Sequence, residues 1–165
     1  MFDAINPNPV EAIIYTHNHA DHTYGATVFA EGSSPDIYAH STTEIYLSRV
    51  IGILRPIISS RSNRMFGNAL PKEQVENNGI GPFLEIGRDG RKPALLNPTK
   101  TFTDQIEFEA AGHKVQLFHA PGETNDQLFV WLPEKKALFP GDNFYKTFPN
   151  LYTCLLYTSD AADER

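Results

Sequence analysis

The sequence predicts an α/β (α+β) fold of the αβ/βα sandwich type, and two observations favour this class. Short apolar runs typical of strands alternate with helical patterns along the chain. Three motifs that carry histidine or carboxylate side chains each follow a predicted strand. An αβ/βα sandwich brings such strand ends together at one edge of its layers, so both observations lead to the same architecture.

The first half of the chain shows strand and helix signals in turn. Residues 10–15 are a short run rich in branched apolar side chains, which indicates a mostly buried strand. A short helix closed by Gly32 is expected at residues 24–30, and a short strand is expected at residues 36–39.

A longer helix and a long loop are expected next. Ser41 and Glu44 form a capping box, which predicts a helix that continues to about residue 54 and is ended by Pro56. Residues 59–101 are rich in Gly, Pro and Asn and show little periodicity, so they predict a long loop. A loop of this length inside a compact domain is usually functional or disordered.

Four strands are expected in the second half of the chain. Residues 105–109 and 114–118 alternate apolar and polar side chains, with a plausible turn at Ala111 and Gly112 between them. A second pair of strands is expected at residues 127–132 and 136–139.

The densest group of chemically active residues follows the first predicted strand, where residues 16–22 read Thr-His-Asn-His-Ala-Asp-His. Neutral imidazole and ionised carboxylate are ligands that suit zinc and similar ions. His17 and His19 point to the same side of an extended chain and can share one ion. Asp21 and His22 follow a bend and can reach a second ion, about 3.5–4 Å away in a two-metal site. The segment is therefore a candidate half of a two-metal hydrolytic centre.

Three motifs together resemble those of the metallo-β-lactamase superfamily. Residues 16–22, followed by Gly25, resemble its first metal-binding signature. Residues 119–123, His-Ala-Pro-Gly-Glu, resemble its next metal motif, which usually reads Pro-Gly-His. Residues 138–142, Leu-Phe-Pro-Gly-Asp, resemble the strand end whose aspartate bridges both metals. The resemblance covers nearly all of residues 8–153 and implies a partial metallo-β-lactamase αβ/βα sandwich.

One departure from the common pattern narrows the resemblance. Glu123 stands where most members of the superfamily have histidine, and a glutamate ligand there is a mark of the alkyl sulfatase group, which hydrolyses detergents such as dodecyl sulfate. Residues 64–71 and 148–153 also resemble segments of that group. The resemblance therefore implies a zinc-dependent sulfuric ester hydrolase.

The resemblance also implies a site of two zinc ions. The ligands implied for the first ion are His17, His19 and Glu123. Those implied for the second ion are Asp21 and His22, with Asp142 bridging both ions. The residues assigned to the catalytic step are Asp21 and Asp142. From the residues alone, Thr124 and Asp126 remain alternatives to Glu123, and Asp126 is a candidate to orient a ligand histidine.

The expected reaction is hydrolysis of an alkyl sulfate ester. Zinc lowers the pKa of bound water to about 7, so a hydroxide bridging the two ions is available at neutral pH to attack the ester. The ester stays anionic, and the candidates to contact it are Arg64, Asn68 and Arg61. Apolar residues of the same predicted loop either line a route for the alkyl chain or only pin the loop to the core: Phe66, Leu70, Ile80, Phe83 and Leu84.

Expected boundaries follow from the same resemblance. Residues 1–153 are expected to form part of a catalytic domain, because an early strand pair and a downstream histidine ligand of the second ion are absent. Residues 154–165 resemble a translated sequencing adapter, and we expect them to be a non-native tail. We therefore expect the chain alone to be nearly inactive, and the full-length protein to be a homodimer that takes a small sulfate ester.

Composition limits the other functions. The formal net charge of −6 argues against a nucleic-acid partner, which needs a basic face. No stretch approaches the ~20 apolar residues of a membrane span, and the only cysteine, Cys154, lies in the expected tail. Two alternatives stay open: another hydrolase of the same fold, acting on lactones, thioesters or phosphodiesters, or a fragment without activity.

Overall fold

The computed structural model describes residues 6–65, 67, 70–74 and 95–144. The chain divides into two compact units. The first unit contains Met1–Leu47 and Pro93–Phe144, and the second contains Ser48–Lys92 and Tyr145–Arg165. All six side chains that the sequence implies as metal ligands lie in the first unit. The expected tail at residues 154–165 lies outside the described residues.

A parallel three-stranded sheet forms one layer of the first unit. Its order is β1 (Ala12–Ile14), β2 (Asp36–His40) and β3 (Lys100–Phe102). The strands expected at residues 10–15 and 36–39 are confirmed, although the first is shorter. Strand β3 was not expected, because two of its three side chains are exposed and it carries no alternating apolar pattern.

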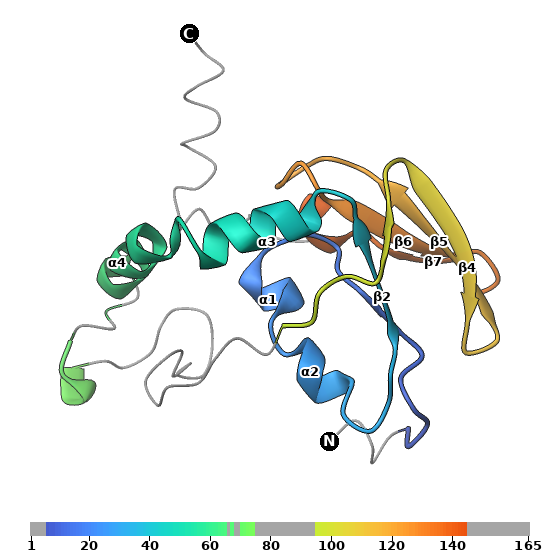
Figure 1. The fold of residues 1–165 in the computed structure, drawn as a ribbon, viewed down its shortest axis with the longest axis horizontal. Coiled ribbons are helices and arrows are strands. Elements are labelled where there is room, and N and C mark those ends of the chain that lie inside the picture. The colour runs from blue at the N-terminus through green and yellow to red at the C-terminus, as the bar shows by residue number, and fades with distance from the viewer. Residues whose placement is uncertain (1–5, 66, 68–69, 75–94, 145–165) are drawn as a thin grey trace, which may run out of the picture. The chain divides into compact units, whose positions relative to one another are not determined.

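An antiparallel sheet of four strands forms the second layer (Figure 1). Its strands in order are β4 (Gln105–Ala110), β5 (His113–His119), β6 (Leu128–Leu132) and β7 (Ala137–Phe139). The four expected strands are therefore confirmed. Ala111 (φ 51°) and Gly112 (φ 72°) connect β4 to β5. Positive φ at both positions is typical of the type I′ turn that joins tightly paired antiparallel strands.

The helices of the first unit differ from the expected ones in their bounds. The helix expected at residues 24–30 is α2 (Ala26–Phe29), because Gly25 adopts a left-handed conformation (φ 102°) and begins it. A four-residue turn, α1 (Ala20–Thr23), precedes it and was not expected. Helix α3 (Thr43–Ile51) confirms the expected longer helix, which ends three residues before the expected end at about residue 54.

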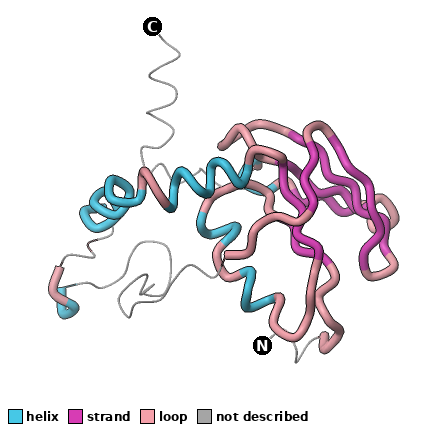
Figure 2. Tube along the Cα trace, viewed as in Figure 1, coloured by secondary structure: helices cyan, strands magenta, loops and turns pink. Residues whose placement is uncertain are grey.

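The second unit corrects the expectation of a loop from residue 59. Helix α4 (Arg55–Met65) covers the first part of this segment, up to residue 65, and a 3₁₀ turn, η2, spans Lys72–Gln74 (Figure 2). Residues 75–94 of the expected loop lie outside the described residues. Pro56 therefore lies in the first turn of a helix, where proline is tolerated, and does not end one. The sequence of α4 lacks an apolar stripe, so its periodicity gave no signal. None of the described helices is long and apolar enough to cross a membrane.

Two apolar clusters show how the first unit is layered. One cluster lies between the two sheets, where Tyr38 stacks on Phe108 with ring centroids 3.7 Å apart. The other lies on the opposite face of β2, where Ile37 and Ala39 pack with Ala26 of α2. Alternate residues of β2 thus face opposite layers, as the pleat of a strand requires. The result is a helix layer on a sheet that packs on a second sheet, which confirms the α/β class.

Candidate metal centre

The histidine-rich loop follows β1, and a backbone hydrogen bond near its start connects it to the four-stranded sheet. The carbonyl of Thr16 accepts a hydrogen bond of 2.9 Å from the backbone N–H of Leu128 at the start of β6. The next residue, His17, is fully buried, and His19 lies just before α1. The first turn of α1 then places Asp21 and His22 beside the preceding imidazoles.

The two other carboxylates come from strand ends of the four-stranded sheet. Glu123 lies in the loop between β5 and β6, which is closed by a 2.8 Å hydrogen bond from the Ala120 N–H to the Gln127 carbonyl. Asp142 lies in the 3₁₀ turn η3 (Gly141–Asn143) that follows β7. With its amide oxygen turned toward η3, the buried Gln127 accepts hydrogen bonds from the backbone N–H groups of Asp142 (2.8 Å) and Asn143 (3.0 Å).

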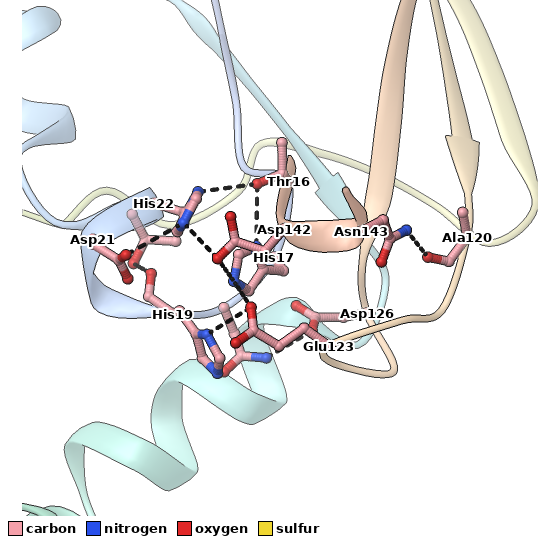
Figure 3. Close-up of polar contacts among 12 residues, drawn as sticks. Thr16, His17, His19, Asp21, His22, Ala120, Glu123, Asp126, Asp142 and Asn143 are labelled. Carbon is pink, nitrogen blue, oxygen red and sulfur yellow. Dashed lines mark hydrogen bonds and ion pairs between the residues drawn. The ribbon is translucent and has the colours of Figure 1, made fainter. Parts of the chain in front are cut away.

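One group of four donors gathers around the Glu123 carboxylate (Figure 3). Its Oε2 atom lies 3.6 Å from both His17 Nε2 and His19 Nδ1. Asp142 completes the group, with Oδ2 3.9 Å from His17 Nε2. One ligand atom from each of the four residues lies within 4.8 Å of all the others. The group contains every residue that the sequence assigns to the first ion.

A second group shares Asp142 with the first. His22 Nε2 lies 3.2 Å from Asp142 Oδ2 and 3.4 Å from Asp21 Oδ2. These three residues also offer ligand atoms within 4.8 Å of one another. Asp142 therefore lies between the two groups, in the place that a bridging ligand occupies. The ligand roles themselves stay predictions, whereas the convergence of the six side chains is a property of the structure.

The arrangement of the donor atoms suits binding of a metal ion better than hydrogen bonding among the donors themselves. His17 Nε2 is buried and has no hydrogen-bond partner within the part of the chain that is described. An unsatisfied buried nitrogen is costly, and a cation among the surrounding carboxylates would satisfy it. Imidazole nitrogens and carboxylate oxygens are also the ligand types of zinc and of several other divalent ions. The residues therefore fit the metal ions that the fold implies.

Most of these donors have a pKa that favours the protonation state in which they bind a cation. Burial, with His22 and His19 nearby, lowers the pKa of His17 to about 4. Burial also lowers the pKa of His19, so both imidazoles are neutral at pH 7. The hydrogen bond to His22 lowers the pKa of Asp21 to about 2, and the same contact raises the pKa of His22. Neutral imidazoles and ionised carboxylates are the forms that bind metals.

The hydroxyl of Thr16 contacts two of the imidazoles at their Nδ1 atoms. Its Oγ1 lies 3.2 Å from Nδ1 of His17 and 3.4 Å from Nδ1 of His22. A hydroxyl oxygen has two lone pairs, so it can accept from both Nδ1–H groups at once. For His17 that tautomer leaves the Nε2 lone pair directed at the carboxylates. For His22 it does so once a cation displaces the Nε2 proton that is shared with Asp21.

Asn18 and Asn143 support the loops that carry the donors and have no signal in the sequence pattern. Asn18, inside the histidine motif, is buried and donates a 2.6 Å hydrogen bond to Asp126. Asp126, a candidate to orient a ligand histidine, accepts its described hydrogen bonds from Asn18 and Thr43. Asn143 donates a 2.7 Å hydrogen bond to the Ala120 carbonyl and so joins η3 to the Glu123 loop.

The residues predicted to contact the substrate belong to the second unit. Arg64 is exposed on α4 of the second unit, and Asn68 lies outside the described residues. Their contact with substrate stays a prediction, as does the role of Arg61. His40 is buried and stacks on His119, with ring centroids 3.9 Å apart.

Fold and donor cluster together define a metal-binding α/β protein. The chain belongs to the metallo-beta-lactamase superfamily, whose sequence model matches residues 2–164. It is 32% identical over 160 residues to a linear primary-alkylsulfatase of a Pseudomonas species. The matched residues are 92% of this chain and 30% of the relative. The family and its alkyl sulfatase relatives, expected from three motifs, are thereby confirmed.

Two further relatives show how far the likeness extends. The exodeoxyribonuclease WalJ of Streptococcus pneumoniae is 24% identical over 143 residues, which are 80% of this chain and 53% of the relative. The structure of a double mutant of the sec-alkyl sulfatase PisA1 matches with a TM-score of 0.67 at 19% identity, over 86% of this chain and 24% of that chain. The latter likeness concerns the fold. The chain spans less than a third of the length of the alkyl sulfatases it matches.

Proposed function

We propose that the chain carries the metal centre of a zinc-dependent hydrolase that cleaves alkyl sulfate esters to alcohol and sulfate, with two zinc ions in the complete site. The observation that carries the proposal is the position of Glu123 against His17 and His19. A glutamate among the histidine donors is the feature by which the sequence resembles alkyl sulfatases and departs from most of the superfamily. The likeness to a linear primary-alkylsulfatase supports the same substrate class.

Each donor group would hold one ion in this proposal. The first ion would be held by His17, His19 and Glu123, the second by Asp21 and His22, and both by Asp142, which is common to the two donor groups. Zinc at such a site lowers the pKa of water to about 7 and so supplies hydroxide at neutral pH. The Thr16 hydroxyl keeps two imidazoles aimed at the ions, and the low pKa of Asp21 keeps its carboxylate ionised.

The substrate places a second demand on the protein. A sulfate ester is anionic at all ordinary pH values, so donors or cations must replace the water around its oxygens. We propose Arg64 and Asn68 as donors to the sulfate group. Replacing Arg64 with alanine is then expected to raise KM for dodecyl sulfate with little change in kcat, which steady-state kinetics on the product of the complete gene would show.

A substrate panel tests the proposed reaction. Dodecyl sulfate, an acyl-homoserine lactone and bis-p-nitrophenyl phosphate are offered to the zinc-loaded product of the complete gene and to the 165-residue chain. We expect the gene product to release sulfate and dodecanol fastest, and to stop when the metal is chelated. The chain alone is expected to turn over slowly at most. Preference for the lactone or the phosphodiester would contradict the proposal.

A phosphodiester is the second candidate substrate. It is favoured by the likeness to an exodeoxyribonuclease over 80% of the chain. Against it stands the formal net charge of −6, since nucleic acid favours a basic surface. A single-stranded oligonucleotide added to the panel separates the two candidates, because only a nuclease would shorten it.

A further inference from the structure

Asp126 is a buried carboxylate that the proposed ligand set does not use. Its side chain is fully buried, and it accepts hydrogen bonds from Asn18 Nδ2 (2.6 Å) and Thr43 Oγ1 (2.8 Å). Both donors are neutral. Within the described residues, no lysine, arginine or histidine side chain forms an ion pair with it. A buried charge without a cationic partner is costly, so a balancing positive charge is expected nearby.

The hydrogen bond to Asn18 connects Asp126 to the loop that carries two donors of the first group. Asn18 stands between His17 and His19 in the chain, so a bond to its side chain holds the backbone that carries both imidazoles. Thr43 lies at the start of α3 and anchors the other carboxylate oxygen. In the view of Figure 3, Asp126 lies to the right of His17 and His19.

The charge of Asp126 also acts on the imidazoles themselves. Asp126 is hydrogen-bonded to Asn18, the residue between the two rings in sequence, and it is fully buried. A negative charge at this place stabilises a cation bound by the rings. Coulomb interactions across a buried region are screened much less than in water, so the effect reaches beyond direct contact.

We infer that Asp126 is a positioning residue of the metal centre: it fixes the His17–His19 backbone through Asn18, and its buried charge is balanced by the bound ions. This inference rests on the proposed metal centre. Residues that support ligands in this way typically change metal affinity about 10- to 100-fold when replaced. The residue is therefore part of what makes the first ion bind tightly.

The test is zinc binding by the 165-residue chain and its Asp126→Asn variant, measured by competition with a chromophoric chelator. Asparagine keeps the shape, and its oxygen can still accept from Asn18 while its amide donates to the Thr43 hydroxyl. We expect the variant to bind the first zinc ion about 10- to 100-fold more weakly, whereas the melting temperature of the metal-free chain stays unchanged or rises. Asp36→Asn, the same change at an exposed carboxylate, is the matched control and leaves zinc affinity unchanged.

A merely structural role predicts the reverse pattern, with a lower melting temperature of the metal-free chain and unaltered zinc affinity, and would overturn the inference. If Asp126→Asn does not fold, the Asn18→Ala variant tests the inference. It removes the hydrogen bond between Asp126 and the loop that carries the ligands, and it leaves Asp126 unchanged. Unchanged zinc affinity in folded Asn18→Ala would also overturn it. Failure of the unchanged chain to bind zinc would instead overturn the proposed metal centre on which the inference rests.

Discussion

The two donor groups that share Asp142 differ in burial and in the support behind them. In the first group the side chain of His17 is fully buried and that of Glu123 is 21% exposed. In the second group the side chain of Asp21 is 70% exposed and that of His22 is 25% exposed. The first group is built from three chain segments that are cross-connected by Asn143 and Asn18. The second depends on a carboxylate at the surface of a four-residue helix.

This difference indicates that the two ions would not bind equally. Donors already fixed by packing lose little conformational freedom when an ion binds, whereas an exposed carboxylate must be ordered at that moment. Charges in a buried site also interact more strongly than charges in water. We therefore expect the first donor group to bind zinc tightly and the second to fill only at higher zinc concentration.

The largest effect is expected from the shared carboxylate. Asp142→Ala removes a ligand from both groups, so both zinc ions should be lost, with affinity at the first group lowered by more than about 100-fold, the upper end for residues that only support a ligand. Metal analysis after dialysis measures this directly. A variant that retains one tightly bound zinc would show that Asp142 belongs to a single group.

Next come two matched amide substitutions that test the groups separately. Glu123→Gln removes the one carboxylate charge that the first group does not share with the second, and it should abolish the tight binding step. Asp21→Asn makes the same change in the second group and should weaken only the loose step. A chelator-competition titration of each variant measures both steps. Equal losses in the two variants would contradict the proposed inequality of the groups.

Protonation should also separate the two groups in the metal-free chain. The unfolded state protonates His17 near its ordinary pKa of 6.5, whereas the folded state does so only near 4. His17 therefore makes stability fall as pH decreases from 6.5 to 4, with no further loss below. His22 acts in the opposite direction, since its raised pKa adds stability at low pH that is lost as pH rises through its folded pKa.

Urea unfolding of the metal-free chain at pH 7 and pH 5 measures this contribution. Other charged or titratable groups face His17, namely His19, His22, Glu123, Asp126 and Asp142. The His17→Asn variant isolates its share, because the other groups remain. We expect the unchanged chain to lose more stability than the variant between the two pH values. An equal loss would mean that burial does not lower the pKa of His17.

The smallest effect is expected at Thr16, which supports one imidazole in each group. Thr16→Val keeps the shape and removes the hydroxyl, so both ion affinities should fall by about 10-fold, the lower end for residues that support a ligand. Thr16→Ser retains the oxygen and should restore them. If the valine and serine variants bind zinc equally well, the hydroxyl does not set the tautomers of His17 and His22.

Much of this site was predictable because its donors lie in short, dense motifs at strand ends. The strands of the four-stranded sheet were also predictable, since they alternate clearly and meet at tight turns such as Ala111–Gly112. Asp126 was also a candidate to orient a ligand histidine, but its partner was not predictable. Asn18 and Asp126 are 108 positions apart, and only the folded chain shows that they form a hydrogen bond.

The region after Pro56 was misjudged for a different physical reason. Helix α4 lacks an apolar stripe, so a periodicity argument reads it as a loop. Proline in its first turn was interpreted as the end of the preceding helix, although proline is equally suited to begin one. Strand β3 escaped notice because Lys100 and Thr101 are exposed and leave only Phe102 to mark it.

Anomalous diffraction at the zinc edge, from crystals of the zinc-soaked chain, tests the central claim most directly. The account predicts two peaks about 3.5–4 Å apart. The stronger should lie about 2.0–2.2 Å from His17, His19 and Glu123, and the weaker beside Asp21 and His22. Zinc bound away from these residues, or Glu123 beyond bonding distance of the stronger peak, would contradict it.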